Sequence, residues 1–190
     1  MTGFANHVII LPIMLPIVAA AFMLLLNERR RTLKNRISIG AALGIAASAI
    51  WLLVQVENPN TPEAVVYKLA SWSAPCGVVR VADRLSALMV LVTATVGAVA
   101  LLYSASRWAA LGPRYHSRFL LLLMGLSGAF LTGDLFNLYV FFEVLLAASY
   151  GLLLHSSGRR RVKAGLHYVA VNLAGSFFFL VGVGVIYALT

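Results

Sequence analysis

The sequence predicts an all-α polytopic membrane protein, with about six transmembrane helices in a single membrane domain. Three observations lead to this prediction: 61% of the 190 residues are hydrophobic, only 11% are charged, and the mean hydropathy is +0.91. Soluble domains carry about 25% charged residues. The composition therefore excludes an ordinary soluble domain.

Six apolar stretches predict the spans, because a spanning helix needs about 20 mostly apolar residues. The stretches cover residues 4–26, 37–56, 85–106, 115–132, 134–155 and 162–189. The fourth and fifth form one apolar run, Tyr115 to His155, which as a single helix would be roughly 60 Å long, twice the thickness of the bilayer core. We therefore expect a break at Thr132-Gly133-Asp134, where the glycine permits a turn and Thr132 or Asp134 can cap the next helix.

The distribution of charge predicts the orientation of these spans. Alternating spans place twelve of the fifteen Lys and Arg residues on one side of the membrane and only Lys68, Arg80 and Arg84 on the other. Basic loops face the cytoplasm, so we expect the N-terminus and the loop at residues 57–84 to be extracytoplasmic. The basic residues lie in short loops between apolar runs, so the net charge of +9 is explained by the orientation of the spans in the membrane. We therefore expect no nucleic-acid binding.

The extracytoplasmic loop at residues 57–84 is the only long connection. Its two β-prone runs, Val65–Leu69 and Cys76–Val81, predict a short β-hairpin on the outer face, and an irregular interfacial loop is an equal alternative. The lone Cys76 excludes an intrachain disulfide. We expect no metal and no cofactor, because the chain has no paired metal ligands, nucleotide-binding loop, flavin motif or iron–sulfur cysteine set.

Glu143 is the only acidic residue in the interior of a predicted span. A charged side chain at the bilayer centre costs roughly 2.5 to 3.5 kcal/mol on insertion scales, and intramembrane acids usually line ion or proton paths. Burial disfavours the ionised form of a carboxyl and a nearby cation favours it, so such a group can be switched between its two protonation states. We interpret Glu143 as a proton carrier. A structural glutamate, neutral and bonded to a neighbouring helix, is the alternative.

Three polar residues of the last span, Lys163, His167 and Asn172, are candidates for a proton path. Histidine titrates near neutral pH and could feed protons inward from the cytoplasmic boundary. The alternatives are a boundary histidine bonded to backbone or water and an asparagine that bonds across helices. Asp134 is better explained as a helix cap, and it lies half a turn away from Glu143, so the two acids form no catalytic pair.

Three motifs carry a resemblance to a known family. Gly133 to Glu143, followed by Ala148-Ser149-Tyr150, resembles the fifth-helix motif of the antiporter-like membrane subunits shared by Mrp-type sodium/proton antiporters and respiratory complex I. Asp83 to Met89 and Lys163 to Val169, with Asn172, are similar to the segments that open the third and sixth helices of these subunits. The resemblance covers all 190 residues and is strongest to the D subunits of Mrp antiporters.

The resemblance implies a function for the chain. It would be a subunit of a multisubunit monovalent cation/proton antiporter in the bacterial cytoplasmic (inner) membrane, with other subunits as partners, sodium as the expected cation and no enzymatic activity. Glu143 would serve a proton half-channel and pair with a lysine of a broken seventh helix. Such subunits have about fourteen helices with inverted repeats, so we expect this chain to be the N-terminal part of a longer subunit and unable to exchange ions alone.

Two other functions stay open at this stage. One is a proton-pumping subunit of a complex I-like NADH:quinone oxidoreductase or a membrane hydrogenase, which would count as a translocase. The other is a structural or assembly subunit that keeps the fold but transports nothing.

Overall fold

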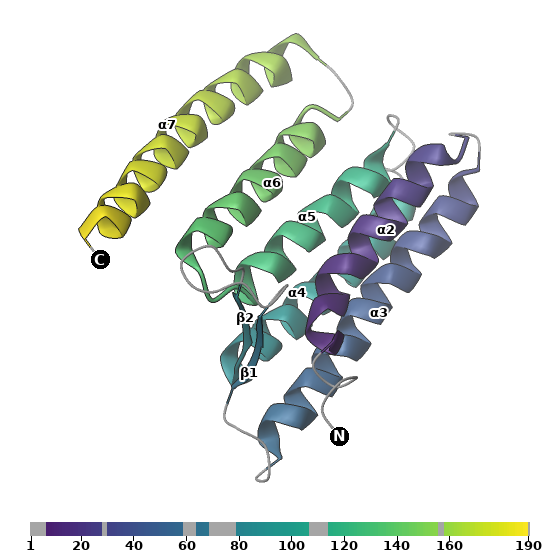
Figure 1. The fold of residues 1–190 in the computed structure, drawn as a ribbon. Coiled ribbons are helices and arrows are strands. Elements are labelled where there is room, and N and C mark those ends of the chain that lie inside the picture. The colour runs from purple at the N-terminus through teal and green to yellow at the C-terminus, as the bar shows by residue number, and fades with distance from the viewer. Residues whose placement is uncertain are drawn as a thin grey trace.

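The computed structural model describes residues 7–27, 30–58, 64–68, 79–106, 114–155 and 158–189. In these residues the chain is mostly helical, which confirms the predicted fold class (Figure 1). The start of the first expected span, at residues 4–6, and Cys76 lie outside the described part. The elements are η1 (Val8–Ile10), α2 (Leu11–Leu25), α3 (Arg31–Glu57), β1 (Val65–Lys68), β2 (Val79–Ala82), α4 (Arg84–Ser106), α5 (Tyr115–Phe130), α6 (Leu135–Leu153) and α7 (Arg159–Leu189).

Five of the described helical segments are long and apolar enough to cross a membrane, so the chain is a multi-pass membrane protein. They are Val8–Leu25, Arg31–Glu57, Arg84–Ala105, Leu135–Leu153 and Val162–Leu189.

The fourth expected span, residues 115–132, is shorter than the sequence predicts. It is occupied by α5, whose 16 residues extend about 24 Å, less than the roughly 30 Å of the hydrocarbon core. The helix ends at Phe130 because the backbone of Leu131 and Gly133 pairs with strand β2 instead of continuing the helix. Even so, α5 lies within the bundle, in contact with α2, α4 and α6.

The helices lie side by side, with α2 and α3 at one edge of the bundle, α5 in the middle and α7 at the opposite edge (Figure 1). The apolar core is formed by α2, α3, α4 and α5, through fully buried side chains such as Ile45, Leu52, Val90, Leu101 and Leu120. Helix α7 packs against α6, and no residue in the apolar 18-residue window of its membrane span is buried. Most of the apolar surface of α7 is therefore left for lipid or for other protein.

The loop before α4 contains the β-hairpin that was one of the two alternatives. Strands β1 and β2 are antiparallel, with Val65 opposite Ala82 and Lys68 opposite Val79. The free edge of β2 pairs with the turn between α5 and α6: the N–H of Val81 donates to the oxygen of Leu131 at 3.0 Å, and the N–H of Gly133 donates to the oxygen of Val79 at 3.0 Å. The hairpin thus covers one end of the α5–α6 pair (Figure 1).

The turn between α5 and α6 lies where glycine and the capping residues predict it. The carboxylate of Asp134 accepts a hydrogen bond from the N–H of Phe136 at 3.1 Å, which confirms its role as N-cap of α6. The Thr132 hydroxyl accepts a hydrogen bond from the Asn137 side chain at 2.8 Å. A Cβ atom at Gly133 would lie 2.6 Å from a methyl group of Val81, so the close approach of β2 requires a glycine here.

Candidate functional site at the α6–α7 interface

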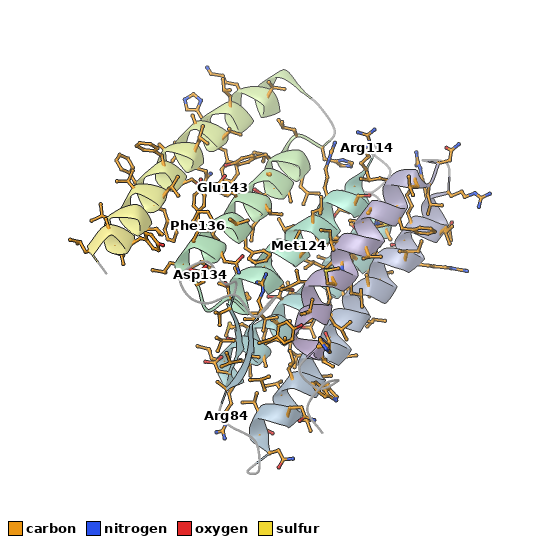
Figure 2. The ribbon with its side chains drawn as sticks, in the orientation of Figure 1. Arg84, Arg114, Met124, Asp134, Phe136 and Glu143 are labelled. Atoms are coloured by element: carbon orange, nitrogen blue, oxygen red, sulfur yellow. The ribbon has the colours of Figure 1, made fainter. Side chains whose placement is uncertain are left out.

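Glu143 lies near the middle of α6, on the side that faces α7 (Figure 2). Before it, the rings of Tyr139 and Phe142 contact the Phe179 ring of α7, with centroids 6.2 and 6.1 Å apart. After it, the Tyr150 ring meets the ring of Tyr168 edge-on at 5.4 Å. Glu143 is therefore enclosed between two aromatic contacts that join α6 to α7.

One carboxylate oxygen of Glu143 is buried without a hydrogen-bond partner among the described residues, although the side chain as a whole is half-buried. Tyr150, two turns further along α6, lies within electrostatic reach of this carboxylate. A buried polar oxygen without a partner is unfavourable, and an unpaired buried charge is more so. The carboxyl thus has a buried oxygen that is available to a hydrogen-bond donor or a cation.

The position of α6 is set by two glycines of α5. A Cβ atom at Gly125 would lie 2.9 Å from the Cβ of Leu145, and one at Gly128 would overlap the ring of Phe141. Small residues at such an interface let two helix backbones approach closely. Because residues advance 100° around a helix, Phe141 and Glu143 point in nearly opposite directions, the first toward α5 and the second toward α7.

The predicted proton path is not assembled around Glu143 in the described part of the chain. Lys163 and His167 are exposed, and Asn172 is half-buried. The Asn172 side chain donates to the backbone oxygen of Tyr168, one turn earlier, at 2.8 Å. Among the described residues, none of these three side chains forms a hydrogen bond or ion pair with Glu143.

A cluster of buried polar groups at the other end of the bundle was not selected from the sequence. Nδ1 of His116 lies 3.1 Å from the hydroxyl of Ser38, which joins α5 to α3. The Tyr115 ring lies between two buried histidines, with centroids 5.5 Å from His116 and 5.1 Å from His155. The only sequence signal is that these two histidines lie near the two ends of the apolar run that folds back on itself, so α5 and α6 bring them together.

Arg80 is another polar residue that was not selected from the sequence, which placed it only in the extracytoplasmic loop. Its side chain is 8% exposed, and burial lowers the pKa of its guanidinium from 12.5 to about 10, so it is still charged at neutral pH. Nη1 donates to the backbone oxygen of Gly128 at 3.4 Å, and the guanidinium carbon lies 4.5 Å from the centre of the Phe141 ring. The alternation of a β-strand was the available signal, because Arg80 points to the opposite face from its neighbours Val79 and Val81.

The fold and the site together define a class: multi-pass membrane proteins with a half-buried carboxyl between two spanning helices. Residues 132–190 match the family described as "NADH:quinone oxidoreductase/Mrp antiporter, TM". A relative from Rhizobium meliloti, named as the D subunit of a probable K(+)/H(+) antiporter, is 53% identical over 189 residues, which are 98% of this chain and 35% of that protein. The D subunit of the Na(+)/H(+) antiporter of Alkalihalophilus pseudofirmus is 38% identical over 188 residues, 97% of this chain and 37% of the relative.

Two solved structures share the fold. The Mrp complex from Dietzia sp. DQ12-45-1b superposes with a TM-score of 0.87 at 30% identity, over 100% of this chain and 35% of the other. The archaeal membrane-bound sulfane sulfur reductase superposes with a TM-score of 0.80 at 28% identity, over 97% of this chain and 37% of the other. The chain is therefore similar to antiporter D subunits, which confirms the predicted resemblance, and it spans about a third of the length of the curated relatives it matches.

Proposed function

We propose that the chain is part of a D-type subunit of a multisubunit monovalent cation/proton antiporter in the bacterial cytoplasmic membrane. This proposal is supported by relatives named as antiporter D subunits and by the structural similarity to an Mrp complex. On this proposal the chain is a transporter subunit and no classical enzyme, its partners are the other subunits, and its N-terminus is extracytoplasmic. Because the relatives include proteins named for sodium and one named for potassium, sodium is one of two cations to test first.

The observation that carries the mechanism is the buried oxygen of Glu143, which has no hydrogen-bond partner in the part of the chain that the structure describes. We propose that Glu143 is the proton carrier of a half-channel between α6 and α7. A cation that approaches this oxygen favours release of the proton, and its withdrawal favours uptake. Lys163, His167 and Asn172 on α7 are proposed to lead protons between Glu143 and the basic end of the bundle.

The direct test is Glu143→Gln in the complete complex, assayed in everted membrane vesicles. The amide keeps the size of the side chain and cannot carry a proton, so we expect cation-dependent proton flux to fall to background while the amount of assembled complex is unchanged. Asp134→Asn is the matched control, because asparagine caps a helix as well as aspartate does, and flux should persist. Unaltered flux in Glu143→Gln would reject the proposal.

A second candidate function follows from the similarity to the sulfane sulfur reductase, which is described as an archaeal respiratory membrane complex. In such an assembly a redox reaction would drive the same proton path, and the chain would belong to a translocase. Genes for quinone-, sulfur- or hydrogen-reacting subunits beside this one favour that candidate, whereas genes for small antiporter subunits favour the antiporter. A purely structural subunit gains support if Glu143→Gln reduces assembly as much as it reduces flux.

A further inference from the structure

Arg80 is a buried cation that the proposed proton path does not use. The partners of its guanidinium within the described residues are the Gly128 carbonyl and the Phe141 ring, and neither carries a negative charge. Desolvating a guanidinium without an anionic partner is unfavourable. The cost of burying this cation at the end of a helix pair is therefore not offset by an ion pair among the described residues.

The contacts of Arg80 join three elements at the hairpin end of the bundle. Its backbone lies in β2 and forms an isolated antiparallel bridge with Thr132 in the α5–α6 turn. Its side chain reaches the last turns of α5 through Gly128 and the second turn of α6 through Phe141. Since β2 is also hydrogen-bonded to Leu131 and Gly133, the hairpin holds the ends of both helices at once.

The contact with Phe141 links Arg80 to the proton carrier. The Phe141 ring is confined between the guanidinium on one side and the Cα of Gly128 on the other, where a Cβ would overlap it. A ring fixed in this way resists rotation of α6 about its axis. Glu143 follows two residues later on the opposite face, so the same constraint keeps its carboxyl directed at α7.

We propose that Arg80 is a positioning residue for Glu143: stacked on Phe141, it fixes the orientation of α6 and with it the direction of the Glu143 side chain. This inference rests on the proposed role of Glu143 as proton carrier.

The test compares Arg80→Gln, Arg80→Lys and Phe141→Leu in the complete complex, with Arg84→Gln as the matched control. Arg84 is an exposed arginine four residues away on the same side of the bundle. Arg80→Gln is expected to reduce the maximal cation-dependent proton flux per assembled complex several-fold. Arg80→Lys keeps the charge but loses the planar stack, so it should reduce the flux as well.

Phe141→Leu removes the stack alone and should behave like Arg80→Lys, whereas Arg84→Gln should match the wild type in flux and in the amount of assembled complex. The inference is overturned if Arg80→Gln and Arg84→Gln have the same flux per assembled complex. If Arg80→Gln does not assemble, normal flux in both Arg80→Lys and Phe141→Leu overturns it. Persistent flux in Glu143→Gln would instead remove the proposed function, so the two failures are distinguishable.

Discussion

The carboxylates of Asp83, Asp134 and Glu143 have different surroundings: the first two precede a helix, and the third lies inside one. Asp83 and Asp134 each accept a backbone N–H at the start of a helix, α4 and α6 respectively, where a negative charge also complements the helix dipole. Glu143 lies nine residues into α6 and has a buried oxygen with no partner in the described residues. Helix capping thus explains Asp83 and Asp134, whereas it does not explain Glu143.

The cap at Asp83 predicts a dependence of stability on pH. The hydrogen bonds from Ser86 lower the pKa of Asp83 below its ordinary value of 3.8. A carboxyl with a lowered folded-state pKa stabilises the protein above its unfolded-state pKa, and this contribution is lost as pH falls through the folded-state value. The wild type should therefore be more stable than Asp83→Asn at pH 7, and this advantage should shrink below about pH 4.

Thermal unfolding of the two proteins in detergent, at pH 7 and at pH 3.5, measures this difference. Asparagine can still accept the Ser86 N–H, so the comparison isolates the charge of the cap. A difference in unfolding midpoint that is equal at both pH values would contradict the assignment.

The α5–α6 pair is the element on which the site depends. Its helices approach closely at Gly125 and Gly128, and its turn is hydrogen-bonded to β2. Arg80 contacts Phe141 where α6 meets α5, and Glu143 lies on the face of α6 toward α7. The short α5 is compatible with this role, because it is surrounded by neighbouring helices and ends where the hairpin supplies backbone partners.

A pair of glycine substitutions tests this packing. Gly128→Ala inserts a methyl group into the Phe141 ring, and such overpacking costs about 1 to 3 kcal/mol. Gly40→Ala on α3 meets nothing within 4 Å and removes a flexible residue from a helix, so it should be neutral or stabilise by up to about 1 kcal/mol. The midpoint of thermal unfolding in detergent should fall for the first variant and not for the second. Equal midpoints would show that α6 does not lie this close to α5.

The whole molecule has two chemically different ends. Arg84 and the hairpin lie at one end, and Arg114 lies at the other, together with the start of α3 (Figure 2). Since basic loops face the cytoplasm, we expect the end with Arg114 to be cytoplasmic. Helix α7 exposes apolar side chains along its length, including Val171 and Phe178, at 71% and 73%. These surfaces require lipid or further protein around the bundle.

Cysteine labelling tests the orientation. In a chain with Cys76 replaced by serine, Arg84→Cys should react with a membrane-impermeant maleimide added to intact cells, because we expect its end of the bundle to be extracytoplasmic. Arg114→Cys, exposed at the opposite end, should react only after the membrane is permeabilised. The reverse pattern would show that the bundle is inserted the other way.

The sequence by itself determined the class of protein, the main spans, the turn at Gly133 and the depth of Glu143. These features depend on local quantities: the length and hydropathy of each run, the turn preference of glycine, and the place of one acid in an apolar segment. The same local reasoning identified the cap at Asp134, since a cap needs only the residues that follow it.

Only the tertiary structure decided which polar groups meet. The Arg80–Gly128 contact joins residues 48 positions apart, and the Ser38–His116 contact joins residues 78 positions apart. Periodicity indicates which face of a strand or helix a side chain occupies, but the partner on that face depends on how the helices pack. Arg80 could therefore be counted as a loop charge from the sequence, and its burial against α6 appears only once the hairpin is docked on the α5–α6 turn.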